Sequence, residues 1–207
     1  MGTDIHGRLR YKRWSHQKDY NYVELPTLFD DRNYDFFAII GNVRNGYGFA
    51  GNSRYENPVE PITNNRGLPE DEPNNYNYNI KTEEETGIYY GDHSYSYVTL
   101  KELKETKLHL QKVIRVGYFN ITEYEEVLKG KTPTTWCGDV SGGNVEKITP
   151  EQYSKNEYDP NKSVYIFYKW EDQPFKEKIE KLICWMECYK HWNSDGSDEV
   201  LIFGFDS

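Results

Sequence analysis

Alternating residue types mark the first stretch of the chain, MGTDIHGRLRYKRW, as a β-strand. Side chains of a strand point alternately to its two faces, so one face carries Thr3, Ile5, Leu9 and Tyr11. The opposite face is polar and carries ionisable side chains, those of Asp4, His6, Arg8, Arg10 and Lys12. A polar strand face is most often solvated, and the alternative is that it binds a ligand.

A short helix is predicted over residues 29–42, FDDRNYDFFAIIGN. Its apolar residues form one patch, an Asp or Asn is available as N-cap, and Gly41 can end the helix. The first turn of a helix has free backbone N–H groups, and here they lie beside Arg32. Such a helix end attracts anions.

The second half of the chain has a more regular pattern. Thr99 and Thr122 each begin a capping-box sequence, and Thr149 is a helix cap followed by proline. LHLQKVIRVGYF, SVYIFYKW and the terminal VLIFGFDS have the composition of strands, and residues 174–192 have the apolar spacing of a long helix. This order predicts an α+β fold, in which strands from both chain ends join a mixed sheet packed by the long C-terminal helix.

Residues 44–90 are rich in Asn, Gly, Pro and Tyr and have little aliphatic periodicity. They form either a surface loop with partial disorder or an ordered loop over a ligand. Disordered segments are usually poor in aromatic residues, and long loops in compact domains are often binding loops, which favours the second interpretation. We therefore expect a single domain over residues 1–207, with 44–90 as an Arg- and Tyr-rich, ligand-covering insertion that carries Arg44, Arg54 and Arg66.

Composition limits the class of ligand. The chain has 207 residues and a formal net charge of −9, which argues against binding of bulk nucleic acid, because phosphates attract an excess of Lys and Arg. A small anion held by a few arginines is compatible with this charge. The first strand is basic and residues 70–92 are acidic. These two regions either pair with each other or form a basic pocket under an acidic flap.

Few features point to a membrane or a metal. The sequence has no apolar stretch of the roughly 18 residues that a membrane span needs, no signal peptide and only 3 cysteines, so we expect a cytoplasmic protein without a membrane partner. Cys184, Cys188 and His191 have a helical spacing that zinc sites use, but no fourth ligand is evident. Neighbouring tryptophans favour packing of these side chains instead, so no metal is predicted and cofactors stay unassigned.

A second polar stretch, GDHSYSYVTL, places acid, base and hydroxyl groups directly before the predicted helix start: Asp92, His93, Ser94 and Ser96. Such groups suit general acid–base catalysis or the binding of a phosphate and a sugar. The alternative is a hydrogen-bonded turn that leads into the helix. If His93 and His6 share a pocket, they can act as base and acid on a phosphodiester, with Asp4 or Asp92 orienting an imidazole or holding a divalent metal. If they do not, both are structural.

Several motifs follow one another along the chain: MGTDIH at the start, DRNYDFFAIIGNVRN at 31–45, NRGLPEDE at 65–72, DHSYSYVTLKEL at 92–103 and the terminal LIFGFDS. They resemble the M-G-x-D-I-H, R-N-Y-D-x-F, V-R-N, R-G-L-P, D-x-H-S-x-S and final F-D of an uncharacterised family of tailed-phage and prophage proteins. The resemblance spans nearly the whole chain and implies no established activity. It points to the polar motif positions Asp4, His6, Arg32, Asn33, Tyr34, Arg44, Arg66, Asp92, His93, Ser94 and Ser96. Departures at Tyr97, Val98 and Gly204 affect packing more than this polar set.

Together these features predict a pocket for a nucleotide-like ligand, with the polar face of the first strand as its floor. Guanidinium groups suit phosphates and tyrosine rings suit bases. The expected ligand-binding residues are Arg8, Arg32, Tyr34, Arg44, Arg66, Ser94 and Ser96. The expected catalytic residues, if the protein is an enzyme, are His6, His93, Asp4 and Asp92.

Three functions are compatible with these features. Small accessory phage proteins often blunt host defence, so the leading hypothesis is an immune-evasion protein in the infected bacterial cell. It would bind and sequester a nucleotide-type defence signal, a cyclic nucleotide or an ADP-ribose derivative. The alternative is a phosphodiesterase or nuclease that cleaves such a nucleotide with His6 and His93. The third is an acidic inhibitor that binds a host protein through Glu83, Glu84 and Glu85. A homo-oligomer that shares its pocket is compatible with each.

Overall fold

The computed structural model describes residues 3–29, 31–48, 51–72 and 93–206, and the chain divides into two compact units. The first unit combines Met1–Asn45, Val59–Gln111 and Gln173–Ser207. The second consists of Gly46–Pro58 and Lys112–Asp172. The sequence pattern did not predict this division, and the expectation of a single domain stays a prediction.

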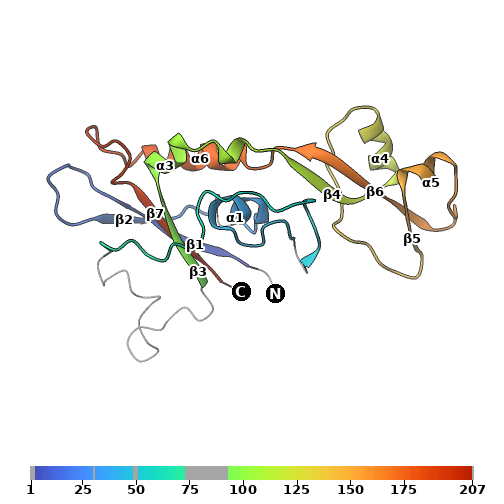
Figure 1. Ribbon diagram of the computed structural model, residues 1–207, viewed down its shortest axis with the longest axis horizontal. Coiled ribbons are helices and arrows are strands. Elements are labelled where there is room, and N and C mark those ends of the chain that lie inside the picture. The colour runs from blue at the N-terminus through green and yellow to red at the C-terminus, as the bar shows by residue number, and fades with distance from the viewer. Residues whose placement is uncertain (1–2, 30, 49–50, 73–92, 207) are drawn as a thin grey trace, which may run out of the picture. The chain divides into compact units, whose positions relative to one another are not determined.

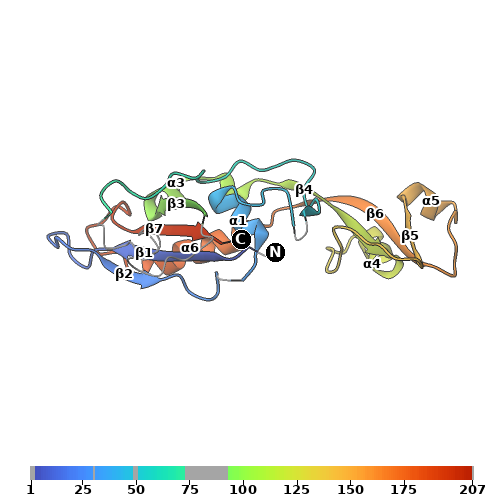
Figure 2. The same ribbon diagram turned by 90° about the horizontal axis from the view of Figure 1, so that it is seen from below.

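The sheet of the first unit joins the two ends of the chain. β1 (Ile5–Tyr11) pairs with β2 (Asn21–Glu24) and with β7 (Val200–Phe205), and β7 also pairs with β3 (His93–Thr99). The order is β2-β1-β7-β3 and every pairing is antiparallel. The start of β1 and the end of β7 lie side by side (Figures 1 and 2). All residues of β7 are buried, as expected for a central strand covered on both faces.

Helix α1 (Tyr34–Gly41) forms where the sequence predicts it. The Asn33 side chain caps its start by accepting a hydrogen bond from a first-turn N–H at 3.0 Å. The helix includes Gly41 and ends at Asn42, which adopts the left-handed conformation. Gly41 is needed for packing, because a Cβ there would lie 2.8 Å from the ring of Phe205. Every residue of α1 is buried, so this helix fills the core over the sheet.

Two further helices complete the first unit. Thr99 and Glu102 form the predicted capping box of α3 (Leu100–Glu105), which is followed by a 3-10 turn, Leu108–Leu110. Helix α6 (Lys176–Glu187) lies beside α3 (Figure 1). It ends before residue 192 because the backbone changes to i→i−3 hydrogen bonds after Glu187. The predicted apolar stripe of α6 is buried, at Ile179, Leu182 and Met186.

The second unit has its own sheet and core. β4 (Val113–Asn120) pairs antiparallel with β6 (Ser163–Asp172), and β5 (Val145–Ile148) pairs with β6 in parallel, so this sheet is the mixed one. Helices α4 (Ile121–Leu128) and α5 (Pro150–Ser154) pack on one face of it. The core consists of Phe119, Tyr124, Ile148, Val164 and Ile166.

Of the two helix starts predicted in the second unit, one is confirmed and one is wrong. Thr149 caps α5 in a capping box with Gln152, as predicted. The prediction of a helix start at Thr122 was wrong, because Asn120 caps α4 by accepting a hydrogen bond from the Glu123 N–H at 2.8 Å. The combination of helices and sheets confirms the α+β fold class.

The predicted insertion at 44–90 is divided between the units. Its Gly46–Pro58 part belongs to the second unit, where the Arg54 carbonyl accepts a hydrogen bond from Val116 at 3.0 Å on the edge of β4. Residues 59–72 belong to the first unit, and 73–90 lie outside the described residues. Whether this segment covers a ligand stays a prediction. Among the described helices, none is long and apolar enough to cross a membrane.

Candidate functional site

The polar face of β1 carries a row of charge pairs. His6 Nε2 lies 3.5 Å from Asp206 Oδ2, and Arg8 Nε lies 2.7 Å from Glu24 Oε1 on β2. Arg10, the third side chain of this face, is 4% exposed. The polar face is therefore not simply solvated, because each of its three central side chains lies beside an acidic residue of the same chain.

Arg10 is the centre of a buried polar network. Its Nη1 donates to Asp71 Oδ1 at 3.0 Å and to Glu72 Oε2 at 2.8 Å. The hydroxyls of Tyr20 and Tyr22 donate to the same two carboxylates, each at 2.8 Å. Burial, together with the hydrogen bond to Glu72, raises the pKa of Tyr22. The basic strand and the start of the acidic segment pair with each other here, which is one of the two arrangements that the charge pattern predicted.

Residues 63–72 reach Arg10 by passing around the β3 edge of the sheet. Thr63 donates a hydrogen bond to the backbone of α1 at 2.5 Å, and the Gly67 N–H donates to the Tyr95 carbonyl on β3 at 2.9 Å. Leu68 then packs against β7 residues that point to the opposite face from α1. This path places the acidic residues over the polar face of β1.

A more exposed group of polar side chains lies where β1 begins and β7 ends. Asp4 accepts two hydrogen bonds from Arg32, from Nε at 2.7 Å and from Nη2 at 3.0 Å. The Asp4 backbone N–H donates to Asp206 Oδ1 at 2.7 Å. We call this group the N-terminal cluster, and its members are Asp4, His6, Arg32, Tyr34, Arg44 and Asp206.

The Asp4 and Arg32 charges stabilise each other. The hydrogen bond and the positive charge of Arg32 hold the pKa of the Asp4 carboxyl below its ordinary value, against the opposing effect of burial. The same contact raises the pKa of Arg32, whose side chain is 58% exposed. Both groups are thus charged near neutral pH, and the guanidinium remains accessible from solvent.

Tyr34 and Arg44 form the inner part of the N-terminal cluster. The Arg44 guanidinium lies 5.0 Å from the centroid of the Tyr34 ring, and its Nε donates to Thr3 Oγ1 at 2.8 Å. Tyr34 is 6% exposed, and within the described part of the chain its hydroxyl has no hydrogen-bond partner. Leaving a buried hydroxyl unpaired costs about 1–3 kcal/mol. Buried polar groups normally have a partner, so this unpaired hydroxyl calls for an explanation.

Backbone strain is also found at this end of the sheet. Arg44 has φ +50° and Ser94 has φ +54°, a conformation that costs energy in residues other than glycine. The pairing of β3 with β7 shifts register between His93 and Ser96. Bulges and left-handed residues of this kind occur frequently beside functional sites.

The two predicted catalytic histidines lie on strands that flank β7. The backbone of His6 pairs with Gly204, and that of His93 pairs with Phe205. Both strands therefore have a histidine at the same end of the sheet. Asp92 and the His93 side chain lie outside the described part, so their convergence with His6 stays a prediction.

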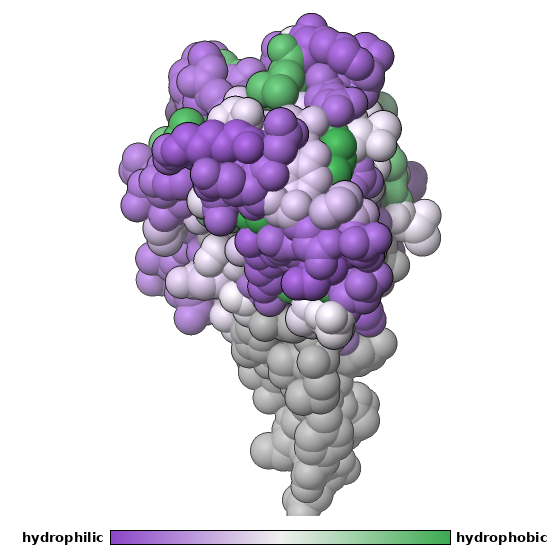
Figure 3. Space-filling view, turned by 90° about the vertical axis from the view of Figure 1, so that its right-hand side faces the viewer, coloured by the Kyte–Doolittle hydropathy of each residue, from purple (hydrophilic) through white to green (hydrophobic). Residues whose placement is uncertain are grey.

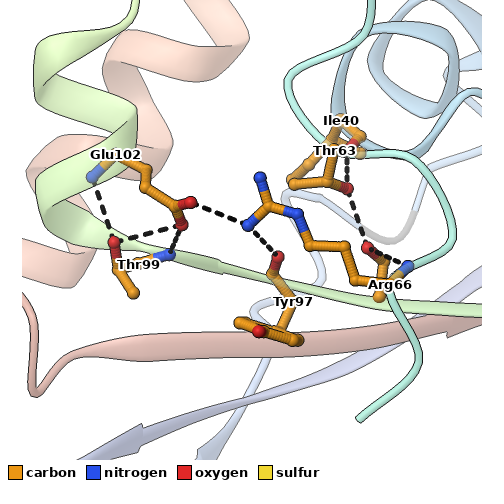
Figure 4. A network of polar contacts seen from close by, with 7 residues as sticks. Ile40, Thr63, Arg66, Tyr97, Thr99 and Glu102 are labelled. Atoms are coloured by element: carbon orange, nitrogen blue, oxygen red, sulfur yellow. Dashed lines mark hydrogen bonds and ion pairs between the residues drawn. The ribbon is translucent and has the colours of Figure 1, made fainter. Parts of the chain in front are cut away.

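Arg66 and Ser96 belong to a different network, drawn in Figure 4. Arg66 Nη1 donates to Glu102 Oε1 at 2.7 Å and to the Tyr97 carbonyl at 3.4 Å. The fully buried Ser96 hydroxyl donates to Thr63 Oγ1 at 2.9 Å and accepts from the Arg66 N–H at 3.3 Å. These contacts connect β3, α3 and residues 63–66.

The structure thus brings Asp4, His6, Arg32, Tyr34 and Arg44 together, and it places Arg8, Arg66 and Ser96 in separate internal contacts.

Replacing Ser96 with alanine is expected to lower the free energy of unfolding by about 1–3 kcal/mol, because the substitution removes one partner of a buried hydrogen-bond pair. Urea denaturation measures this loss. Ser154→Ala is the matched control, since Ser154 is exposed and its expected change is within about 0.5 kcal/mol. Equal stabilities of the two variants would contradict a structural role for the Ser96 hydroxyl.

The Cys184, Cys188 and His191 group does not have the geometry of a metal site. Both thiols are exposed, whereas His191 is buried with Nε2 3.3 Å from Asp198 Oδ2 and Nδ1 accepting from the Asn193 N–H at 3.3 Å. Over the described ranges, no three His, Cys, Asp or Glu side chains are arranged to hold a metal. The imidazole has a partner at each ring nitrogen, which is typical of a structural histidine.

The N-terminal cluster combines hydrogen-bond donors with carboxylate acceptors. Guanidinium and tyrosine hydroxyl groups can donate hydrogen bonds to anionic oxygens. The carboxylates of Asp4 and Asp206 can accept hydrogen bonds from hydroxyl or amino groups. Sequence reasoning did not select Asp206 or Thr3, although the final F-D of the motif series was a signal for Asp206. Thr3 was assigned only to packing, and its role depends on the turn at Arg44.

Comparisons with known proteins add no assignment, since no family model, no curated protein and no solved structure matches the chain.

Proposed function

We propose that the N-terminal cluster binds a nucleotide-type ligand, a cyclic nucleotide or an ADP-ribose derivative. The observation that carries this proposal is the buried Tyr34 hydroxyl, which has no partner among the described residues and lies in a cluster with two guanidinium groups. A phosphate oxygen accepts hydrogen bonds from hydroxyl and guanidinium groups alike.

The carboxylates make a nucleotide a better candidate than inorganic phosphate. Asp4 and Asp206 lie within the same cluster, and Asp4 is held in its charged form by Arg32. Two carboxylates repel a bare anion. A ligand that carries hydroxyl or amino donors beside its phosphate avoids this repulsion, because those donors can bind the carboxylates.

We propose capture of the ligand rather than its cleavage. The groups that suit capture, Arg32, Tyr34 and Arg44, lie together. In a phage-encoded protein, as the motif resemblance implies, capture of a host defence nucleotide would block signalling. The third hypothesis, an acidic inhibitor acting through Glu83, Glu84 and Glu85, concerns residues outside the described ranges.

Cleavage is the second candidate, and one observation favours it. The His6 imidazole lies 3.5 Å from the Asp206 carboxylate, and an acid–base histidine is commonly oriented by such a group. In a phosphodiesterase, water would attack the phosphorus atom and the P–O bond to the leaving alkoxide would break. His6 would take the proton from the water or give one to the alkoxide, and His93 would carry out the other transfer.

One experiment separates the two candidates. The protein is incubated with cyclic di-GMP, cyclic di-AMP and ADP-ribose in turn, washed, and denatured by heat, and the released small molecule is identified by mass spectrometry. Intact release of a panel member supports capture. Release of a hydrolysed product, abolished in His6→Ala, supports cleavage. If no panel member is retained or altered, the proposed function is wrong.

A further inference from the structure

The second unit has a hollow of its own, which the proposed function does not use. Its volume is about 280 Å³, and it lies at one end of the core face of the β4-β6-β5 sheet. The apolar walls are Val127, Pro133, Trp136, Tyr168 and Trp170. The polar rim consists of residues 130–132, Glu171 and Asp172.

Two tryptophans form a corner of this hollow. The rings of Trp136 and Trp170 have centroids 5.4 Å apart and planes inclined by 73°. Trp136 lies against Gly117, where a Cβ would come within 2.8 Å of the indole ring. Arg115, which is 3% exposed, lies 5.2 Å from the Trp136 centroid and pairs with Asp172. Gly117 and Arg115 thus pack against Trp136, and the rings of both tryptophans are only half-buried.

The loop on the other side of the hollow is fixed by α4. The Glu123 carboxylate accepts hydrogen bonds from the Thr134 N–H at 2.6 Å and the Thr135 N–H at 3.3 Å. Glu126 binds Lys129 and Lys131, and these contacts lower the pKa of Glu126 to about 2. Residues 129–135 are therefore held in place by two carboxylates of one helix, so the hollow is formed before any ligand enters.

The charges around the hollow are balanced. Glu171 binds Lys112 at 2.6 Å, Asp172 binds Arg115, and Lys131 binds Glu126. A balanced site does not favour a lone cation or anion. The surface seen from the side of α5 and β5 is mainly hydrophilic, with hydrophobic side chains in small separate patches (Figure 3). A broad apolar docking surface is therefore not evident on that face.

We propose that this hollow binds a neutral sugar ring. The C–H face of a pyranose packs on an aromatic ring, whose negative face attracts the weakly positive hydrogens. The rim then offers the Thr132 hydroxyl to the sugar hydroxyls, which donate and accept hydrogen bonds. A proline-rich peptide also packs on aromatic walls, but a proline ring has no hydrogen-bond donor for this hydroxyl.

Titration with methyl glycosides of glucose, galactose, mannose and N-acetylglucosamine tests this site, with tryptophan fluorescence and calorimetry as readouts. We expect at least one glycoside to bind with a Kd of ~1 mM. Trp170→Ala is expected to weaken binding at least tenfold, at roughly 1.4 kcal/mol per factor of ten. Trp192→Ala, at an 84% exposed side chain of the first unit, is the control and should bind as the wild type does.

Thr132→Val keeps the test decisive if Trp170→Ala fails to fold, because Thr132 is exposed and its substitution removes only the hydroxyl. A loss of affinity of about threefold is expected for Thr132→Val. The proposal is overturned if no glycoside binds, if Thr132→Val and the folded Trp170→Ala bind as the wild type does, or if a proline-rich peptide binds in place of every sugar.

Discussion

An Arg10→Leu variant is expected to lose about 3–5 kcal/mol of unfolding free energy, the usual cost of removing one partner of a buried ion pair. The Arg10 side chain is 5% exposed and that of Glu72 is 2% exposed. Leucine leaves the Glu72 charge buried and Asp71 without its guanidinium, and two tyrosine hydroxyls cannot neutralise two carboxylates. Urea denaturation at neutral pH measures the loss.

Two further variants are compared with Arg10→Leu. Arg13→Leu removes the same charge at an exposed position and should change stability by no more than about 0.5 kcal/mol. Arg10→Leu combined with Glu72→Leu should recover part of the loss, because no unpaired buried charge remains at residue 72. A loss below about 1 kcal/mol in Arg10→Leu would contradict the buried network.

Arg44→Ala is expected to weaken nucleotide binding by roughly 10- to 100-fold, since a hydrogen bond to a charged group contributes about 1.5–3 kcal/mol. The substitution removes the guanidinium beside the Tyr34 ring and leaves the ring in place. Isothermal titration calorimetry with the panel member that the wild type retains measures the change. Tyr34→Phe, which loses only the unpartnered hydroxyl, should weaken binding by roughly 3- to 10-fold.

The control for this series is Arg13→Ala, which makes the same change of charge at an exposed arginine outside the cluster. It should bind the nucleotide as the wild type does. If Arg13→Ala weakens binding as much as Arg44→Ala, the effect comes from overall charge.

Local signals in the sequence predicted most elements of the fold. The capping boxes at Thr99 and Thr149, the apolar patch of α1 and the buried stripe of α6 are each set by a few neighbouring residues. The exceptions have physical reasons. Asn120, and not Thr122, is the N-cap of α4, and the side chains of both residues can accept a hydrogen bond from a first-turn N–H. The second unit was missed because it is assembled from two segments more than fifty residues apart along the chain, and periodicity does not report such contacts.

The sequence identified candidate residues of the site but not the side chains with which they interact. The polar face of β1 and the Arg32 and Tyr34 positions were selected from strand alternation and motif order. The partners of each arginine depend on tertiary contacts: Arg8 pairs with Glu24 on the neighbouring strand, Arg66 pairs with Glu102 of a helix cap, and Arg44, whose backbone has φ +50°, donates to Thr3. The sequence pattern did not distinguish these arginines, whereas in the structure each has a different interaction partner.

Amide chemical-shift mapping reports directly where on the chain a nucleotide binds. The nucleotide retained by the wild type is added to ¹⁵N-labelled protein, and each amide shift is followed to saturation. The largest shifts are expected at residues 3–6, 32–34, 44 and 204–206, which form the N-terminal cluster and its backbone. Shifts confined to residues 112–172, or no shift with any panel member, would rule out binding at this cluster.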